Sequence, residues 1–388
     1  MTTLAQTPAA SRPPVQSSSR PSVCIVCHKA YGALSGRGGH IGGVEWQASL
    51  LAKWLAQKHY EVTLLTWDEG GPSVEIIDGV RVIKIARQSA GLKGLRFFHK
   101  WTSLVKAMRQ ANCDVYYHHG AECVTGQMAL WCASNGRPFV FYSANDTDCQ
   151  ANLPEFRTPW DRALYRCGLR RATVRITQTE AQRATLKKDF DLDSIVLRYP
   201  CYDPKRPGLP LSAPPSNRVL WIARVCRQKR PDRLLDLAER CPELEFDLVG
   251  PLYSDDYSQS VSQRARRMPN VTLHGPASRN QVPAFYMNAA CLCCTSDYEG
   301  FPNTFLEAWS HGLPIISTFD PESLIEKKQL GIVVGNVTEM QAALQSLLKS
   351  PLLYRTLSQN AYSYFLENHT CEVVLPKYED VFTSLSQK

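Results

Sequence analysis

Residues 296–318 read Ser-Asp-Tyr-Glu-Gly-Phe-Pro-Asn-Thr-Phe-Leu-Glu-Ala-Trp-Ser-His-Gly-Leu-Pro-Ile-Ile-Ser-Thr. The apolar run that precedes them, 291–295, and the run at 313–318 predict two buried strands with a turn and a helix between them. Pro302 stands where the first turn of a helix tolerates a missing N–H, and Gly312 follows the last expected helical residue. The stretch therefore predicts a strand–turn–helix–strand unit of a parallel sheet.

Two carboxylates of this unit, Glu299 and Glu307, are eight residues apart, one in the turn and one on the second turn of the helix. We expect both to face the crevice beyond the carboxyl end of the preceding strand. Unpaired N–H groups and the positive end of the helix dipole would bind an anion between them. A phosphate held by backbone, with a carboxylate for sugar hydroxyls on each side, indicates a nucleotide-sugar site. The anion site is expected in Gly300, Phe301, Pro302, Asn303 and Thr304.

The string Glu-Gly-Phe-Pro-Asn-x-x-Leu-Glu-Ala at 299–308 resembles the E-x7-E signature of family 4 glycosyltransferases, which are retaining enzymes. The spacing alone would also fit an ordinary βαβ unit, but the glycine, proline and asparagine of the turn favour the family. The resemblance implies an α/β protein with the GT-B fold, in which two doubly wound Rossmann-like domains face a central cleft. It also implies that Glu307 holds the ribose hydroxyls and Glu299 the sugar hydroxyls near the reacting carbon.

Size and composition agree with two globular domains, since the chain has 388 residues and is 44% hydrophobic. The net charge of +8 suits nucleotide diphosphates or an acidic membrane face and is too diffuse to predict nucleic-acid binding. Fourteen cysteines, several within apolar runs, predict free thiols in a reducing compartment. No apolar run approaches the ~20 residues that span a bilayer. We therefore expect a cytoplasmic protein, with peripheral contact to the inner membrane face as an alternative.

Alternating strand and helix patterns predict a parallel, doubly wound sheet in each half of the chain. A proline-dense segment after Pro200 separates the halves. We expect four parts: a disordered polar tail (1–21), an acceptor-side domain (22–203), a nucleotide-sugar-binding domain (204–365) and a helix that crosses back to the first domain (366–388).

A glycine-rich loop follows the first strand and ends in Gly42-Gly43-Val-Glu. This motif resembles the family's first loop, where small residues let the diphosphate and the acceptor approach the backbone; a flexible surface loop is the alternative. The strand at 114–118 ends in His118-His119. The family usually has a histidine near the donor sugar just past this strand, and the pattern favours His119, although two histidines also fit a polar strand end.

The strand at 139–143 is followed by Asn145 and Asp146, which are acceptor-side candidates only, because the Thr-x-His of many relatives is missing. Asp146-Thr-Asp148 also fits the D-x-D metal motif of the other glycosyltransferase fold. The GT-B fold generally needs no such motif, so no metal is predicted.

In the second half, the strand at 218–223 is followed by Arg224-Val-Cys-Arg-Gln-Lys229, which resembles the family's G-R-x4-K. The resemblance implies that Arg224 and Lys229 neutralise the diphosphate as its bond to the sugar breaks. Ala223 replaces the usual glycine before the arginine, and Arg230 replaces the usual glycine after the lysine. The alternative is a basic loop before a helix.

Residues 92–110 predict an amphipathic helix. The favoured interpretation is a core helix with a solvated basic face; the alternative is a helix that lies on an anionic membrane and reaches a lipid-linked acceptor. The apolar arc contains Phe97, Phe98, Trp101, Leu104, Val105 and Met108, and the basic residues Lys93, Arg96, His99, Lys100 and Lys106 fall largely opposite.

These patterns predict a retaining glycosyltransferase of the hexosyltransferase type. It would move a sugar from a UDP- or GDP-type donor to a glycan or lipid-linked acceptor, without a cofactor, in cell-surface polysaccharide or glycolipid synthesis. A front-face displacement is preferred, because no nucleophile is paired with a base. The alternatives are a nucleotide-sugar epimerase and a non-catalytic binding protein. The latter would be expected to lack Arg224, Lys229 or one of the two glutamates, and the chain has all four.

Overall fold

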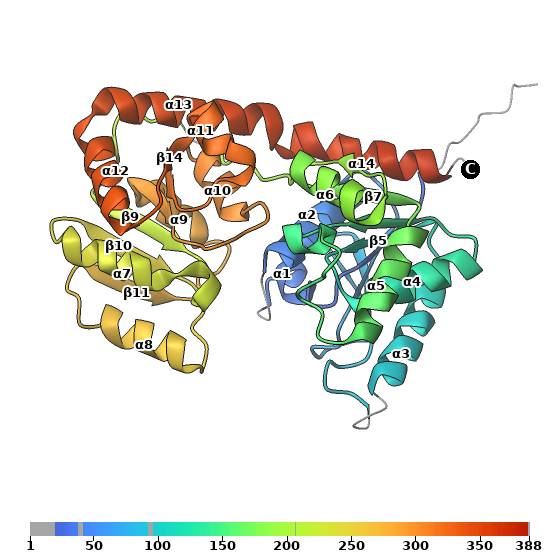
Figure 1. The fold of residues 1–388 in the computed structure, drawn as a ribbon. Helices are drawn as coiled ribbons and strands as arrows, with labels where there is room; N and C mark the ends of the chain where they lie inside the picture. The colour runs from blue at the N-terminus through green and yellow to red at the C-terminus, as the bar shows by residue number, and fades with distance from the viewer. Residues whose placement is uncertain (1–19, 38–41, 92–95, 206, 387–388) are drawn as a thin grey trace, which may run out of the picture.

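The structure is a computed structural model that describes residues 20–37, 42–91, 96–205 and 207–386. Its α/β fold contains two separate sheets (Figure 1). The first sheet has the order β3-β4-β2-β1-β5-β6-β7-β8 and is parallel except for the hairpin of β3 and β4. Its strands are β1 Val23–Val26, β2 Val62–Thr66, β3 Val74–Ile77, β4 Val80–Lys84, β5 Val115–His119, β6 Phe139–Tyr142, β7 Val174–Thr177 and β8 Ile195–Val196.

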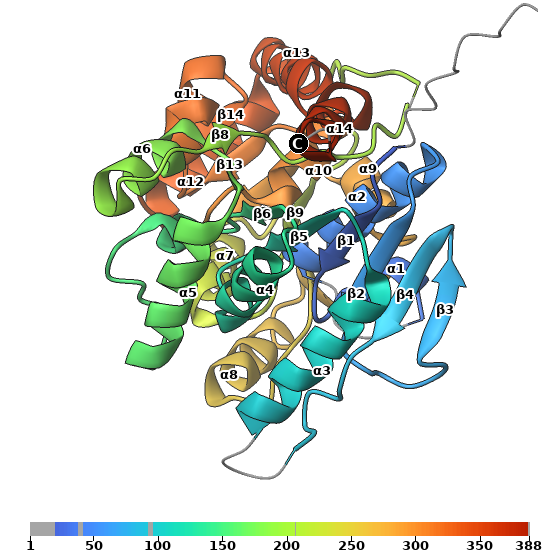
Figure 2. The same cartoon turned by 90° about the vertical axis from the view of Figure 1, so that its right-hand side faces the viewer.

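Helices connect the parallel strands of the first sheet and cover its faces (Figure 2). They are α1 Tyr31–Ser35, α2 Gly43–Gln57, α3 Arg96–Ala111, α4 Cys123–Ser134, the 3-10 turn η1 Asp146–Cys149, α5 Pro159–Arg171 and α6 Glu180–Phe190. The β1 strand is buried along its whole length, as its apolar sequence predicts, because helices pack on both faces of a parallel sheet.

The second sheet is parallel throughout and has the order β11-β10-β9-β12-β13-β14. Its strands are β9 Arg218–Ile222, β10 Glu245–Val249, β11 Val271–Gly275, β12 Cys291–Cys294, β13 Ile315–Ser317 and β14 Gly331–Val333. Its helices are η2 Arg227–Lys229, α7 Pro231–Arg240, α8 Asp256–Ala265, α9 Val282–Asn288, α10 Asn303–Ser310, η3 Pro321–Ser323, α11 Leu324–Lys328, α12 Val337–Lys349 and α13 Pro351–Asn368.

Each sheet changes its direction of growth at a central pair of strands, β1 and β5 in the first and β9 and β12 in the second. A crevice opens beyond the carboxyl ends of such a pair, because the connections leave in opposite directions. The loops that follow β9 and β12 contain Lys229 and Glu299, so the topology alone brings these two predicted residues to one place.

The last helix, α14 Cys371–Ser386, continues from α13 and packs on the first domain (Figure 1). Phe382 lies edge-on to Tyr117 of β5 at 6.0 Å, and the Tyr60 hydroxyl donates to Glu379 at 2.9 Å. Residue 366, where we place the start of the crossing segment, lies within α13. Where α13 meets α14, the chain runs beside the linker, and the Cys201 N–H donates to the His369 carbonyl at 2.7 Å.

The amphipathic helix is α3, Arg96–Ala111, and the expected first residues 92–95 lie outside the described residues. Its second half packs into the core through Leu104 and Met108. The first half of α3 is not packed into the core in the same way, because Phe98 is 62% exposed. The expectation that the whole apolar arc is buried is therefore wrong for this end of the helix. Among the described residues, no helix has the length and apolarity required to cross a membrane.

Candidate active site between the two domains

Lys229 and Glu299 form an ion pair between the loops that follow β9 and β12. The Ser296 hydroxyl donates to the same Glu299 Oε1 at 2.6 Å. Both side chains are largely shielded from water, with exposed fractions of 16% for Lys229 and 11% for Glu299. An ammonium and a carboxylate that are 70 residues apart in the chain are thus held together immediately before the first turn of α10.

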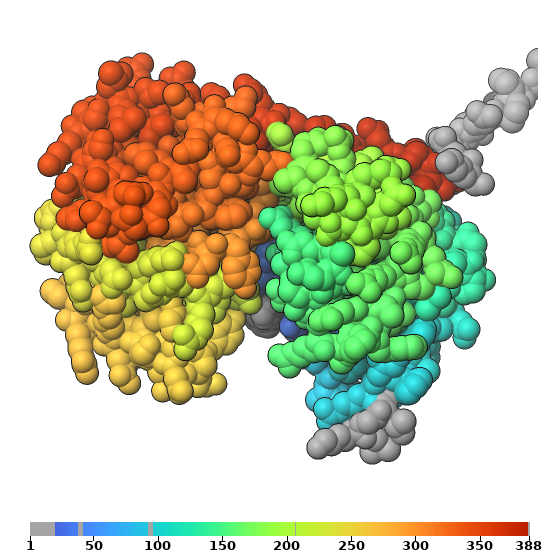
Figure 3. Space-filling view, viewed as in Figure 1, coloured from blue at the N-terminus to red at the C-terminus, as the bar shows by residue number. Residues whose placement is uncertain are grey.

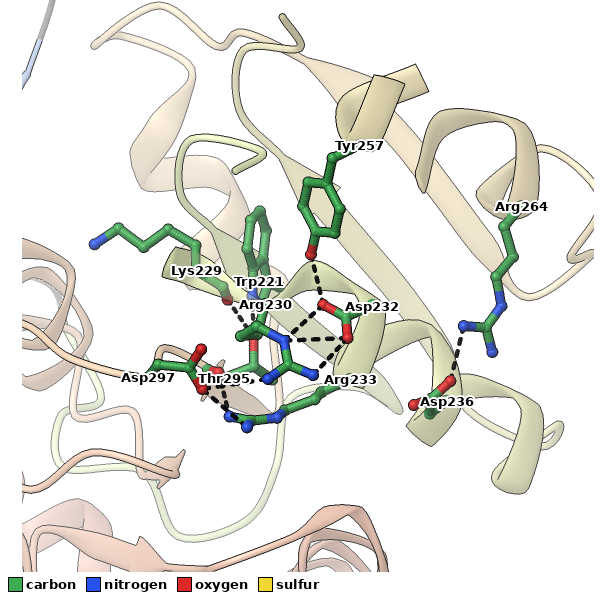
Figure 4. Close-up of polar contacts among 10 residues, drawn as sticks. All are labelled: Trp221, Lys229, Arg230, Asp232, Arg233, Asp236, Tyr257, Arg264, Thr295 and Asp297. Carbon is green, nitrogen blue, oxygen red and sulfur yellow. Dashed lines mark hydrogen bonds and ion pairs between the residues drawn. The ribbon is translucent and has the colours of Figure 1, made fainter. Parts of the chain in front are cut away.

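Four further hydrogen bonds fix these loops to one another. The Trp221 indole N–H donates to Thr295 Oγ1 at 2.9 Å, and this hydroxyl donates to the Lys229 carbonyl at 2.7 Å (Figure 4). The Asp297 N–H donates to the Gln228 carbonyl at 2.9 Å, and the Gln228 side chain donates to the Tyr298 carbonyl at 2.9 Å. The backbone on both sides of the Lys229–Glu299 pair is therefore fixed before any ligand arrives.

Glu307, on the second turn of α10, is held by two residues that sequence reasoning missed. Arg279 forms an ion pair with Glu307 Oε1, and the Tyr286 hydroxyl donates to Oε2 at 2.8 Å. Burial and the neighbouring carboxylate raise the pKa of Tyr286. The Arg279 guanidinium also lies 3.8 Å from the ring centroid of Trp46, in α2 of the first domain. Glu307 consequently lies at the boundary between the domains.

The turn before α10 touches the first domain where the sequence predicts a donor site. A Cβ added to Gly300 would lie 2.9 Å from the Ala144 carbonyl oxygen and 3.2 Å from Asn145 Cα. A Cβ added to Gly43 would lie 2.6 Å from the Asn303 side chain, which also accepts a hydrogen bond from Gln47 at 2.8 Å. The backbone contact at Gly300 leaves no room for a larger residue, and the two domains approach each other closely at both positions. Figure 3 shows the groove between the two halves of the molecule.

The other predicted donor-binding residues have supporting positions. Pro302 is the N-cap of α10 and has no side-chain acceptor for the first N–H groups of the helix, and Thr304 lies in the first turn. Phe301 packs inward against Trp309, with ring centroids 6.2 Å apart. Gly42 is the N-cap of α2. Their direct contact with a donor stays a prediction.

Arg224 is exposed, and no hydrogen bond or ion pair joins it to another residue in the described part of the chain. It precedes η2 in the same loop as Lys229. An arginine without a protein partner remains available to an anionic ligand, whereas Lys229 already has a carboxylate.

His119 is the last residue of β5 and is buried in the first domain. It is 3% exposed; its Nε2 is 2.7 Å from the Tyr199 hydroxyl, and its ring centroid is 4.6 Å from that of Tyr142. Burial lowers the pKa of His119 to about 3, so the ring is neutral at pH 7. The sequence could not show whether His119 faces the donor or the core, because a polar residue at a strand end fits both positions. In this structure His119 packs against Tyr142 and Tyr199, and its catalytic role stays a prediction.

Asp146 is the first residue of the turn η1, which follows β6, and Asn145 is the N-cap of this turn. The Ala144 and Asn145 N–H groups donate to Asp148 Oδ2 at 2.6 and 3.1 Å, and Gln182 donates to Asp146 Oδ1 at 2.9 Å. Burial raises the pKa of Asp148 to about 7. The Asp-Thr-Asp sequence is thus a hydrogen-bonded cap, and no group of three His, Cys, Asp or Glu residues that could hold a metal ion occurs in the described ranges.

Two family models match the chain, one in each domain. The model described as "Glycosyltransferase Family 4" matches residues 41–206, and the model described as "Glycosyl transferases group 1" matches residues 216–350. The chain is 21% identical to an uncharacterized glycosyltransferase of Haemophilus influenzae, over 88% of this chain and 97% of the relative. It is also 25% identical to the amylovoran biosynthesis glycosyltransferase AmsD of Erwinia amylovora, over 42% and 48% of the two chains.

Solved structures share the fold at low sequence identity. The sucrose-phosphate synthase of Thermosynechococcus elongatus superposes with a TM-score of 0.76 at 16% identity, over 94% of this chain and 99% of that chain. The Anabaena protein HepE, in complex with UDP-glucose, superposes with a TM-score of 0.73 at 15% identity, over 94% and 100%. With both domain models matched and both sheets in place, the chain belongs to the family 4 glycosyltransferases of the GT-B fold.

Proposed function

We propose that the chain is a retaining hexosyltransferase that moves a sugar from a UDP- or GDP-type nucleotide sugar to a glycan or lipid-linked acceptor. The observation that carries the proposal is the Lys229–Glu299 ion pair, placed immediately before the uncapped first turn of α10 at the boundary of the domains. It combines a shielded positive charge, the first N–H groups of a helix that has no side-chain cap, and a carboxylate, which are the groups that a sugar diphosphate requires.

In the proposed complex, the diphosphate takes up Lys229 and the N–H groups at the start of α10, and the exposed Arg224 approaches it from the same loop. The leaving diphosphate gains negative charge as its bond to the sugar breaks. Charges that are already positioned stabilise this state, because they need no reorganisation at the moment of reaction. The diphosphate would replace Glu299 as the principal partner of Lys229, which frees the carboxylate to accept the sugar hydroxyls.

Glu307 is proposed to hold the ribose. Its two carboxylate oxygens already accept from Arg279 and Tyr286, so its orientation is fixed, and the remaining lone pairs are available to hydroxyl donors. The complex of HepE with UDP-glucose supports a uridine nucleotide as the first donor to test.

Retention is proposed to occur by front-face displacement. Glu299, the carboxylate nearest the expected reacting carbon, is bound to Lys229 and Ser296 and is not paired with a general base. The acceptor would enter from the first domain, past Asn145 and the glycines at the start of α2.

The name of AmsD supports cell-surface polysaccharide synthesis as the setting. The exposed Phe98, together with the basic residues of α3, supports a peripheral contact with the anionic cytoplasmic face of a membrane, where a lipid-linked acceptor would be found.

Calorimetry with UDP, GDP and ADP tests the donor site, because a nucleotide that binds the native state has a measurable affinity and raises the unfolding temperature. We expect UDP or GDP to bind and Lys229→Ala to weaken that binding. Nucleoside diphosphate release from a bound donor should then increase when an acceptor is added. If neither UDP nor GDP binds, the proposed function is wrong; release that is independent of every acceptor would favour an epimerase.

A further inference from the structure

Arg230 has a backbone conformation that side chains rarely adopt. With φ 49° and ψ 50° it lies in the left-handed region, between η2 and the first turn of α7. This region places the Cβ of an L-residue too close to a carbonyl oxygen, whereas glycine adopts it freely. Glycine would therefore suit the backbone better, and an arginine at this position needs a compensating reason.

The reason lies in the contacts of its guanidinium (Figure 4). Nε and Nη2 donate to the two carboxylate oxygens of Asp232, at 3.1 and 2.8 Å, and Nη1 donates to Asp297 Oδ1 at 3.3 Å. Asp297 also accepts from Arg233 at 2.9 Å, and Asp232 accepts from the Tyr257 hydroxyl at 2.5 Å. Planar guanidinium geometry suits this bidentate contact, which a lysine cannot reproduce.

These contacts connect the two loops of the donor site. Asp232 is on α7, directly after the loop that ends in Lys229, and Asp297 lies in the loop that contains Glu299. The guanidinium of Arg230 thus links the segment that contains Lys229 to the loop that contains Glu299. The Lys229 side chain itself extends away from this network (Figure 4).

We propose that Arg230 is a positioning residue for Lys229: by bridging Asp232 and Asp297 it holds the two loops at the separation in which Lys229 faces the donor diphosphate. The inference rests on the proposed function. Arg230 acts on the nucleotide through Lys229 and does not touch it, and its unfavourable backbone conformation is retained because the bridge needs this side chain.

UDP and GDP calorimetry on single and double variants of the full chain tests the proposal. We expect Arg230→Gly to lower the affinity about ten-fold, within the range found for residues that share one network. Combined with Lys229→Ala, Arg230→Gly should change the affinity less than about two-fold, because the residue through which it acts is already missing. Arg230→Ala should lower the affinity similarly but unfold at a lower temperature than Arg230→Gly, since alanine tolerates the left-handed conformation less well than glycine.

Asp297→Ala, which removes both the charge and the acceptor oxygen, gives a test of opposite sign. It removes a negative charge near the diphosphate, so a purely electrostatic effect would strengthen nucleotide binding. Loss of the bridge weakens it, which is the outcome we expect. This test also decides the matter if Lys229→Ala binds too weakly to be measured. The matched control is Arg264→Ala, which breaks pairs with Asp236 and Glu239 in the same domain and should leave the affinity unchanged.

The outcomes separate this proposal from the proposed function. If Lys229→Ala weakens binding while Arg230→Gly does not, Arg230 is no positioning residue and the donor site stands. Equal losses from Arg230→Gly with and without Lys229, or tighter binding by Asp297→Ala, would likewise overturn it. Unchanged binding by Lys229→Ala would overturn the donor site itself.

Discussion

The two sides of the cleft present different kinds of groups. We call the side formed by the second domain the donor wall and the side formed by the first domain the acceptor wall. The second domain presents charged side chains, Lys229, Glu299 and Glu307, each with a partner that fixes its orientation. The first domain presents backbone and small residues: Gly43 faces Asn303, and the Ala144 carbonyl faces Gly300. Charged groups act on the donor by their chemistry, whereas small residues act by what they allow to come close. The donor wall should therefore be sensitive to loss of charge and the acceptor wall to gain of volume.

The sharpest test of the donor wall is Lys229→Ala. We expect turnover to fall by at least ~10²-fold, the scale for removing one preorganised charge stabiliser. Single-turnover transfer from the donor measures it, with Arg264→Ala as a charge-loss control on α8. A near-normal rate would show that the Lys229–Glu299 pair is structural, and the contrast between the walls would fail.

The two carboxylates of the donor wall should separate by kinetic parameter. Glu307→Ala should mainly weaken nucleotide binding, by roughly 1.5–3 kcal/mol for a lost charged hydrogen bond. Glu299→Ala should mainly lower kcat at saturating donor, because an interaction made chiefly in the transition state affects kcat.

Calorimetry and kcat at saturation measure the two effects independently. Circular dichroism must match the parent in both variants, since Glu307 is early in α10 and favourable to the helix dipole. Unchanged nucleotide affinity in Glu307→Ala, or a normal kcat in Glu299→Ala, would contradict this division of roles.

Gly300→Ala tests the acceptor wall from the opposite side, because Gly300 belongs to the second domain and its added volume would press on the backbone of Ala144 in the first domain. The new methyl group would lie 2.9 Å from the backbone oxygen of Ala144, so the domains must separate slightly, at about 1–3 kcal/mol for overpacking. We expect kcat/KM for transfer to fall while nucleotide affinity changes less. Gly335→Ala is the control, since its methyl group would meet only the flexible Glu339 side chain, at 3.3 Å. Equal losses in both variants would refute close domain contact as the cause.

The smallest effect is expected outside the cleft, at α3. If this helix contacts anionic lipid, Arg96→Glu with Lys106→Glu should reduce sedimentation with acidic vesicles, at ~1 kcal/mol per basic residue. Higher salt should reduce it further. Lys187→Glu with Lys188→Glu, on α6 of the same domain, controls for net charge. Absence of vesicle binding by the unmutated chain would leave α3 as a core helix with an exposed aromatic end.

Features of the fold that depend on a local sequence pattern could be predicted from the sequence. The apolar run at 291–295 predicts β12 nearly to the residue, because strands buried on both faces have a continuous apolar pattern. The family resemblance implies that Lys229 and Glu299 act on one donor, and the structure brings them together because the loops that contain them follow the neighbouring central strands β9 and β12. These predictions use local patterns and one topological rule.

Other features depend on contacts between segments that no local pattern joins. Arg279 is 28 residues before Glu307 and follows an edge strand, so nothing in its own segment indicates the pair. The burial of His119 depends on Tyr199, which is 80 residues further along the chain. The left-handed backbone of Arg230 is indicated only by the glycine that the resemblance to the family's G-R-x4-K pattern implies at this position. Side-chain pairing across loops is therefore where sequence reasoning ends.

The chain crosses between the domains twice, once in the linker and once where α13 meets α14, and the two crossing segments lie side by side. This arrangement restricts how the domains can move relative to each other. The linker and the junction of α13 with α14 are hydrogen-bonded to each other, through Cys201 and His369, and His369 Nδ1 also lies 2.9 Å from the Tyr199 carbonyl oxygen. Two connections bound side by side act as one hinge with a single axis, whereas one flexible tether would allow twisting and sliding as well. A rotation about this hinge would move Gly300 away from Ala144 and Asn303 away from Gly43 together, so donor entry and product release would follow the same motion.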